Sequence, residues 1–333
     1  RLLTGLLSKQ KFESTLEGSA QLSKRPMERI IKPLCENGAK ITDNNGKLPL
    51  FFTPSEYTFE HINSSKPSAQ VKSGLLLASL YHESFQTTIT EETPTRDHTE
   101  RMLSLMGVNL VRLGNSVTVE PKSKLQNIDY NVPGDPSSAA FLIAIGVLRS
   151  KELNIQNVLL NERRIGFLKI LRKMNADITI KDVEVQNNEN VGTIVVKKSK
   201  LKGVMVEGKD VADMVDEFPV FTLLASQAEG NTVVKGAEEL RLKESDRIMA
   251  MENFILNLGG QINTSSNGYK ISGIQKLQGG LIKTEEDHRI AMTGVVANLC
   301  INSEIKIDNT ECISDSYPSF FYDLKNIGAE YVS

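Results

Sequence analysis

The chain has 333 residues, of which 40% are hydrophobic and 24% are charged, and its formal net charge is −2. This length is too great for a single hydrophobic core, so we expect a globular protein with two domains. The near-neutral charge excludes a broadly basic surface and so indicates no nucleic-acid partner, and an anionic ligand would need a local cluster of basic side chains.

The cysteines and the apolar segments narrow the class of protein further. The three cysteines, Cys35, Cys300 and Cys312, form no C-x-x-C pair. This argues against a disulfide framework or a structural zinc site and favours a reducing, cytoplasmic location. No apolar run reaches the length of a membrane span, and no signal peptide is visible, so we expect no membrane partner.

The first predicted element is a helix at residues 1–8, which begins without an initiator methionine or an N-cap residue. Such a start is typical of the inside of a helix. We therefore expect that the chain is truncated at its N-terminus and that this helix is the tail of a repeat unit.

Five later segments share a pattern that predicts a helix, a left-handed turn and then a strand. The segments are 34–41, 103–110, 171–178, 255–262 and 324–331. Their turn residues are Gly38, Gly107, Asn175, Gly259 and Gly328. Glycine adopts a positive φ without strain and asparagine is the usual second choice, so these residues should end their helices.

A second set of helices alternates with the first, and beyond a polar first turn these helices are apolar nearly all round. Such a pattern predicts burial. The buried helices are expected at 68–81, 137–148, 216–226 and 288–300. Short runs rich in β-forming residues lie between the two sets, at 86–92, 153–160, 231–237 and 303–308.

One repeat unit therefore has the order strand, buried helix, strand, capped helix, strand, strand, which predicts an α/β fold. We expect a first domain at residues 1–133, with a headless unit and one following unit. The second domain is expected at residues 134–333, with three units.

Several arginines stand at the predicted starts of these helices, where a cation opposes the helix dipole. Their repetition predicts bound anions, because helix N-termini bind phosphate and carboxylate groups. The alternative is that each arginine turns toward a neighbouring carboxylate such as Asp246 or Asp287. The arginines are Arg25, Arg96, Arg247 and Arg289.

Small polar residues at the same helix starts have a simpler explanation. Serine and threonine are common N-cap residues. Capping is therefore favoured over ligand binding for Ser23, Thr95, Ser137 and Ser138.

The segment KESDRI, at 243–248, is the most highly charged of the predicted helix starts. We expect Lys243 and Arg247 to bind an anion. Asp246 is expected to hold an arginine in place, and Arg241 to be a solvated or structural charge.

Three carboxylates near the helix starts are candidates for proton transfer, namely Asp216, Glu217 and Glu244. Neighbouring cations would lower the pKa of such a group and burial would raise it. His288 is more typical of a hydrogen-bonding scaffold than of a catalyst, and we expect no metal around it.

Eight motifs, in order along the chain, resemble those of the 5-enolpyruvylshikimate-3-phosphate (EPSP) synthase family. They are SKRPMERIIKPLCENGAKI (23–41), PSAQVKSGLLLASLY (67–81), TRDHTERM (95–102), GDPSSAAFLIA (134–144), DEFPV (216–220), LRLKESDRI (240–248), DHRIAM (287–292) and SYPSFFYDL (316–324). Each motif alone is weak, but eight in sequence are specific.

The resemblance implies a two-lobed enolpyruvyl transferase fold, built from βαβαββ units with helices inward and sheets outward, here without the first unit. The implied reaction moves the enolpyruvyl group of phosphoenolpyruvate to the 5-hydroxyl of shikimate 3-phosphate and releases phosphate. It runs by addition and then elimination. The family needs no metal and no other cofactor, and a monomer is expected.

The resemblance also implies a role for each matching residue. Asp216 would take the proton of the attacking hydroxyl, and Glu244 would handle the proton at the methylene carbon. The implied phosphoenolpyruvate ligands are Arg25, Gln70, Arg247 and Arg289. The implied shikimate 3-phosphate ligands are Ser68, Ala69, Gln70, Arg96, Asp216 and Lys243.

Two features depart from the family pattern. Many members carry a lysine where this chain has Asp315. The family's leading segment, with its Lys-Ser…Arg motif and its glycine loop, is absent before Arg1. We therefore expect at most weak catalysis by this chain alone.

The nearest alternative is UDP-N-acetylglucosamine enolpyruvyl transferase, which shares the fold and usually has a reactive cysteine in a mobile loop. Cys35 lies in a predicted helix instead, and the motifs SAQVKS and KESDRI favour the EPSP synthase family. An inactive fragment that binds anions is the alternative from another class.

Overall fold

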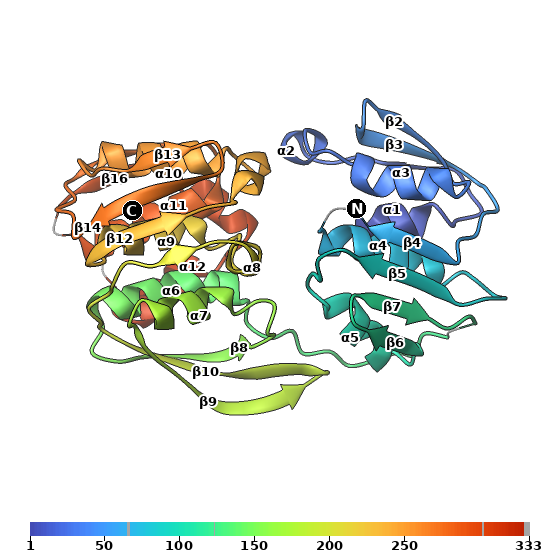
Figure 1. Cartoon of the computed structure of the whole chain (residues 1–333), viewed down its shortest axis with the longest axis horizontal. Coiled ribbons are helices and arrows are strands. Elements are labelled where there is room, and N and C mark those ends of the chain that lie inside the picture. The colour runs from blue at the N-terminus through green and yellow to red at the C-terminus, as the bar shows by residue number, and fades with distance from the viewer. Residues whose placement is uncertain (65–66, 123, 302, 330–333) are drawn as a thin grey trace. The chain divides into compact units, whose positions relative to one another are not determined.

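The computed structural model describes residues 1–64, 67–122, 124–301 and 303–329. Its internal contacts divide the chain into two compact units, which we call unit 1 (Arg1–Asn131) and unit 2 (Val132–Ser333). Helices and strands alternate along both units (Figure 1). The α/β class expected from the sequence is therefore confirmed.

In the part of unit 1 that the structure describes, the strands form two small sheets, with the orders β1-β3-β2 and β4-β5-β7-β6. Strands β4 and β5 pair in parallel, and the other pairs are antiparallel. The strands are β1 (Ser14–Leu16), β2 (Lys40–Asn44), β3 (Lys47–Thr53), β4 (His61–Ser64), β5 (Thr87–Glu91), β6 (Leu110–Leu113) and β7 (Ser116–Val119). The helices are α1 (Leu2–Leu7), α2 (Ala20–Ser23), α3 (Glu28–Glu36), α4 (Ala69–Ser79) and α5 (His98–Leu105).

Helix α4 forms the centre of unit 1, since it packs against α1, α3, α5 and β5. Its Leu75 and Leu76 are fully buried, as its apolar sequence predicts. Helix α1 meets α4 at two glycines, because a Cβ on Gly5 would lie only 1.8 Å from the carbonyl oxygen of Gly74. This backbone contact leaves no room for a side chain on Gly5 and fixes α1 against α4.

The described residues of unit 2 form three sheets, with the strand orders β8-β10-β9, β11-β12-β14-β13 and β15-β16. The strands are β8 (Leu153–Leu159), β9 (Asp177–Gln186), β10 (Glu189–Lys197), β11 (Met205–Val206), β12 (Gly230–Val234), β13 (Asn263–Ser265), β14 (Gly268–Gly273), β15 (Gly280–Ile282) and β16 (Ile305–Ile307). The helices are α6 (Pro136–Arg149), α7 (Gly166–Lys173), α8 (Lys209–Asp213), α9 (Phe218–Ser226), the 3-10 helix η1 (Glu238–Leu242), α10 (Arg247–Asn257), α11 (His288–Cys300), the 3-10 helix η2 (Glu311–Asp315) and α12 (Phe320–Asn326).

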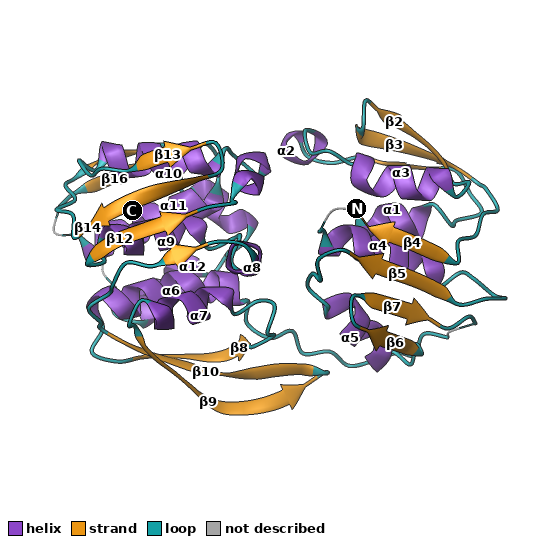
Figure 2. Cartoon of the chain, viewed as in Figure 1, coloured by secondary structure: helices purple, strands orange, loops and turns teal. Residues whose placement is uncertain are grey.

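Three helices form the centre of unit 2, because α6, α9 and α11 contact one another in every pair. Each also packs on a different sheet: α6 on β8 and β10, α9 on β14, and α11 on β16. Figure 2 shows these helices in purple among the orange strands. Every residue of α9 is buried. Within unit 2 the helices therefore lie inside and the sheets outside, as the resemblance implied.

All five predicted turn residues adopt the left-handed conformation. Their φ angles are 105° at Gly38, 89° at Gly107, 69° at Asn175, 73° at Gly259 and 80° at Gly328. At each turn, the N–H of the next residue donates to a carbonyl five residues back, which is the Schellman pattern. Strands follow the turns at Gly38, Gly107, Asn175 and Gly259, so the expected link from helix end to strand is confirmed there. The strand expected after Gly328 lies outside the described residues.

Asn175 allows a direct test of this turn, because it is the one member of the set with a side chain. Asn175→Ala is expected to lower the free energy of unfolding by about 1 kcal/mol, since alanine tolerates positive φ poorly. Asn175→Gly should stay within about 0.5 kcal/mol of the unsubstituted protein, because relief of strain and loss of chain stiffness offset each other. Urea unfolding followed by circular dichroism measures both, and equal effects would contradict the prediction.

Candidate active site

The starts of three helices meet in unit 2 around one arginine. Arg247 is the first residue of α10, and its side chain is 0% exposed. Its Nε donates to Oδ2 of Asp287 at 3.0 Å, and its Nη2 donates to Oε2 of Glu244 at 2.7 Å. Its Nη1 lies 3.5 Å from Oδ1 of Asp216, just before α9. The sequence left open an anion or a carboxylate as the partner of Arg247, and three carboxylates contact it.

Asp287 joins two of these helix starts. It is the N-cap of α11, where its Oδ1 accepts the backbone N–H of Arg289 at 2.9 Å. Its Oδ2 accepts the hydroxyl of Ser245 at 3.1 Å as well as Nε of Arg247. Burial alone would raise the pKa of Asp287, but the charge of Arg247 outweighs it and lowers that pKa. Asp287 therefore stays ionised between α10 and α11.

Lys243 lies beside the same carboxylates, in the segment between η1 and α10. Burial lowers the pKa of Lys243, while the negative charges of Asp216 and Glu244 oppose that shift. The structure thus brings Lys243, Arg247, Asp216 and Glu244 together, four residues that the sequence predicted for one site.

Glu217 has a different environment from its neighbour Asp216. Glu217 is only 3% exposed. Burial raises its pKa first, the charge of Asp216 raises it further, and Arg289 and a hydrogen bond with Ser137 oppose the rise. Two adjacent carboxylates resist ionising together, so the buried one takes the proton more readily. Of the two, Asp216 is the better candidate for a base.

Arg289 and His288 begin α11. Burial and the charge of Arg289 lower the pKa of His288 below its usual value, so its imidazole is neutral near pH 7. Arg289 also lowers the pKa of Asp135, although burial opposes this and Arg164 contributes more. The start of α11 therefore places one cation close to the start of α6.

Arg241 and Asp246 form a structural pair. Nη1 of Arg241 donates to Oδ2 of Asp246 at 2.6 Å, and the same guanidinium bonds the carbonyl oxygens of Ser265 and Ser266. Asp246 also caps α10 by accepting the N–H of Met249 at 3.1 Å. The expectation that Asp246 holds an arginine is confirmed, and that arginine is Arg241.

In unit 1, the predicted ligands Ser68, Ala69 and Gln70 stand at the start of α4. Ser68 is the N-cap, and its hydroxyl accepts the N–H of Val71. Gln70 points back to the chain start, where its Oε1 accepts Nη1 of Arg1 at 3.1 Å. These contacts set the first turn of α4 and place the Gln70 amide beside a cation.

Two arginines lie outside the helices to which the sequence analysis assigned them. Arg25 stands three residues before α3 and Arg96 two residues before α5. The prediction that they occupy first turns is wrong. Arg25 precedes Pro26, and a residue before proline avoids the helical region. Neither cation therefore opposes a helix dipole from within the first turn.

The four suggested caps are also wrong. Ser23 ends α2, and its hydroxyl donates to the carbonyl of Gly18. Thr95 donates its hydroxyl to Glu91 instead of capping α5. Ser137 and Ser138 lie inside α6, whose N-cap is Asp135. The hydroxyls of Ser23 and Thr95 bond a carbonyl and a carboxylate instead. The carboxylate of Asp135 caps α6 in place of the two serines.

A buried ion cluster beside the unit 1 site was not predicted from the sequence. Nζ of Lys72 lies 2.8 Å from Glu91 Oε2 and 2.7 Å from Glu100 Oε1, and these side chains are at most 5% exposed. Glu91 also accepts the N–H and the hydroxyl of Thr95, the residue before Arg96. The cluster therefore holds the loop that carries Arg96. A lysine within an apolar helix was the available signal, because buried charges need partners.

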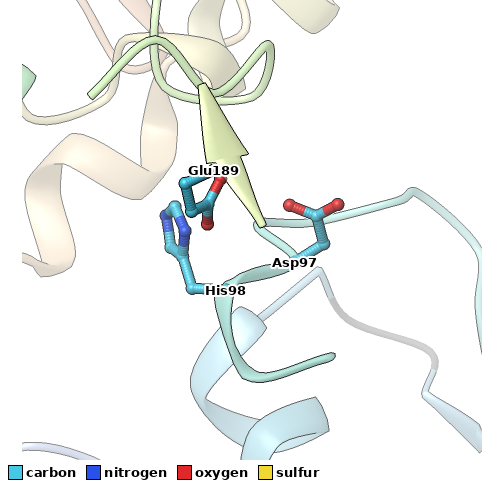
Figure 3. Close-up of side chains that lie close together, drawn as sticks. All are labelled: Asp97, His98 and Glu189. Atoms are coloured by element: carbon cyan, nitrogen blue, oxygen red, sulfur yellow. The ribbon is translucent and has the colours of Figure 1, made fainter. Parts of the chain in front are cut away.

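Figure 3 draws Asp97 and His98, which are neighbours at the start of α5, together with Glu189 of β10. Asp97 forms ion pairs with Arg101 at 3.0 Å and with Arg112 at 2.8 Å. In unit 2, Glu189 accepts a hydrogen bond from the amide of Asn161 at 3.0 Å. Asp97 and Glu189 each bind these partners within their own unit. We therefore assign no metal site to these three residues.

The cysteines and the helix lengths bear on two other expectations. Cys35, Cys300 and Cys312 are free thiols, as expected. Burial raises the pKa of Cys300 to about 12 and that of Cys312 to about 11, so both stay protonated at neutral pH. Of the helices in the described ranges, none is both long enough and apolar enough to cross a membrane.

The family model and the curated relatives that match this sequence name the same enzyme family. The family model described as EPSP synthase (3-phosphoshikimate 1-carboxyvinyltransferase) matches residues 1–324. A 3-phosphoshikimate 1-carboxyvinyltransferase of Endomicrobium trichonymphae is 44% identical over 331 residues, which cover 98% of this chain and 77% of that protein. Its counterpart from Oceanobacillus iheyensis is 40% identical over 330 residues, with the same coverage of 98% and 77%.

Solved structures agree with the sequence comparison. An EPSP synthase from Acinetobacter baumannii matches with a TM-score of 0.87 and 39% identity, covering 98% of this chain and 76% of that one. The enolpyruvyl transferase NikO from Streptomyces tendae matches with a TM-score of 0.77, covering 99% of this chain and 76% of that one. At 18% identity, the second likeness concerns the fold alone.

Proposed function

Since the chain belongs to the EPSP synthase family, we propose that it transfers the enolpyruvyl group of phosphoenolpyruvate to the 5-hydroxyl of shikimate 3-phosphate. Phosphate is released. This is a step of the shikimate pathway, which leads to the aromatic amino acids. The structural observation that carries the proposal is the contact of Arg247 with both Asp216 and Glu244, because the reaction needs a cation for its anionic substrate beside two proton-transfer groups.

The chemistry asks for this combination. In the addition step the 5-hydroxyl oxygen bonds to the central carbon of phosphoenolpyruvate, and the methylene carbon gains a proton. In the elimination step that carbon loses a proton and phosphate leaves. We assign removal of the hydroxyl proton to Asp216 and transfer of the carbon-bound proton to Glu244. The raised pKa of the buried neighbour Glu217 means that the first proton shared by the pair goes to Glu217, which supports the choice of Asp216 as the ionised base.

The substrates carry phosphate and carboxylate groups, which guanidinium and ammonium groups bind well. We propose that the phosphoenolpyruvate ligands are Arg25, Gln70, Arg247 and Arg289. We propose that the shikimate 3-phosphate ligands are Ser68, Ala69, Gln70, Arg96, Asp216 and Lys243. Support for the second set in unit 1 comes from the capped first turn of α4, which presents N–H groups together with Ser68 and Gln70.

The proposal predicts phosphate release that depends on both substrates. Release should occur with phosphoenolpyruvate and shikimate 3-phosphate together and stay at background when either is absent. Glu244→Gln should remove it, because an amide cannot carry the proton. A colorimetric phosphate assay measures this. Release that does not depend on shikimate 3-phosphate, or that requires UDP-N-acetylglucosamine instead, would refute the proposal.

We further propose that the protein acts as a monomer in the cytoplasm, without a nucleic-acid partner. The three free thiols support a reducing compartment. The net charge of −2 gives no electrostatic reason for nucleic-acid binding. Light scattering coupled to size-exclusion chromatography measures the oligomeric state directly.

A further inference from the structure

The carboxylates around Arg247 differ in how deeply they are buried. Asp287 is fully buried and accepts three hydrogen bonds, from Arg247 Nε, the Ser245 hydroxyl and the Arg289 backbone N–H. Separating Asp287 from Arg247 would leave a buried charge without its ion pair, which is strongly unfavourable. Asp287 is therefore a fixed partner of Arg247.

Glu244 is more exposed to solvent than Asp287. It lies in the segment between η1 and α10, its side chain is 17% exposed, and its Oε2 accepts Nη2 of Arg247 at 2.7 Å. Asp216 is 20% exposed and makes a longer contact of 3.5 Å with Nη1. Solvent reaches both carboxylates, so either can move away from Arg247 and remain hydrated.

The carboxylates at this position cancel its positive charge. Arg247, Lys243 and Arg289 supply three positive charges, and Asp216, Glu244 and Asp287 supply three negative charges. An incoming phosphate or carboxylate would increase the repulsion unless it replaced one of the three carboxylates. A guanidinium binds such groups through paired N–H donors, and Glu244 and Asp216 hold the Nη donors.

We propose that Glu244 and phosphoenolpyruvate compete for the Nη edge of Arg247, while Asp287 keeps the guanidinium in place for both. This inference rests on the proposed function, because it takes phosphoenolpyruvate as the anion. Binding of the anion displaces Glu244 from Arg247, and the displaced side chain is then available to the methylene carbon. One exchange of partners thus couples substrate binding to the freeing of the proton-transfer group.

The two carboxylates should therefore affect binding in opposite directions. Glu244→Gln keeps the shape and removes the competing charge, so phosphoenolpyruvate should bind roughly tenfold more tightly. Asp287→Asn loosens Arg247, so phosphoenolpyruvate should bind roughly tenfold more weakly. Calorimetric titration with phosphoenolpyruvate alone measures the dissociation constant of the unsubstituted protein and of each variant, because no turnover occurs without shikimate 3-phosphate. Glu244→Gln is also expected to stop turnover, so its titration can be repeated at saturating shikimate 3-phosphate.

Three further variants or measurements make the test specific. Glu238→Gln removes the same charge from an exposed residue of η1 and should leave the dissociation constant unchanged. Urea unfolding checks that each variant is folded, and if Asp287→Asn is not, Ser245→Ala removes one of its hydrogen bonds and should weaken binding less. Weaker or unchanged binding by Glu244→Gln would overturn the competition. Phosphate release by the unsubstituted protein is measured separately, so failure of the proposed function is distinguishable.

Discussion

Lys72→Met is expected to lower the free energy of unfolding of unit 1 by about 3–5 kcal/mol, because it leaves two buried carboxylates without their cation. Lys72 contacts Glu91 and Glu100 within 2.8 Å, at the centre of the α4 packing. Methionine fills a similar volume, so the loss is electrostatic rather than a cavity. Urea unfolding gives the size of the loss, and hydrogen-exchange mass spectrometry of α4 peptides assigns it to unit 1. Peptides from α6 in unit 2 serve as the internal reference.

A matched set of variants separates charge from packing in this cluster. The triple variant Lys72→Met, Glu91→Gln, Glu100→Gln has no charge left to strand, so it should recover much of the lost stability. Because Glu91 also bonds Thr95, the triple variant should still bind shikimate 3-phosphate more weakly through Arg96. If the single and triple variants were equally unstable, burial of unpaired charge would not be the cause.

Asp216→Asn is expected to reduce kcat for phosphate release by roughly 10²–10⁴-fold, the usual contribution of a positioned general base. Asparagine has the same size as aspartate, and its amide oxygen can still accept a hydrogen bond from Arg247. The protein should therefore remain folded. Steady-state phosphate release at saturating substrates measures the change. The acid limb of the pH–rate profile should also disappear, since the group that must ionise is gone.

Asp210→Asn provides the control for this variant. Asp210 lies in α8, six residues before Asp216, and its side chain pairs with Lys173 at 2.7 Å. Ion pairs at the surface contribute little to stability. Its kcat should match that of the unsubstituted protein. A kcat for Asp216→Asn within threefold of that control would show that another group takes the hydroxyl proton.

Features that depend on neighbouring residues in the chain were predictable from sequence. The left-handed turns at Gly38, Gly107, Asn175, Gly259 and Gly328 follow from the limited set of residues that tolerate positive φ. The buried helices follow from apolar character on all sides, which no solvated helix retains. Both signals are local, so the order of helices and strands and the α/β class could be read without a structure.

The exact starts of the helices were harder to predict, because competing partners decide them. Thr95 could cap α5, but Glu91 of β5 takes its hydroxyl. Ser137 and Ser138 could cap α6, but Asp135 lies two and three residues before them and its carboxylate accepts the N–H of Ser138. The Arg25 assignment ignored the restriction that Pro26 places on the residue before it. A cap is a choice among several acceptors, and sequence alone does not rank them.

The residue types of the site were predictable, but their partners were not. Charged helix starts indicated Lys243, Glu244 and Arg247 together with Asp216. That Asp287 and Ser245 would bond across from α11 to α10 depends on how two helices pack. Packing brings together segments that are distant in the chain, and a periodic pattern contains no information on which of them meet.

The three carboxylates on Arg247 come from three different segments of unit 2. Each substitution at positions 216, 244 or 287 therefore changes the electrostatic cost of the other two, so their energetic effects will not add. The effect of a substitution in one segment therefore depends on which residues stand in the other two. The three segments thus form one energetic unit, and we expect a substitution in any one of them to be felt through the guanidinium by the other two.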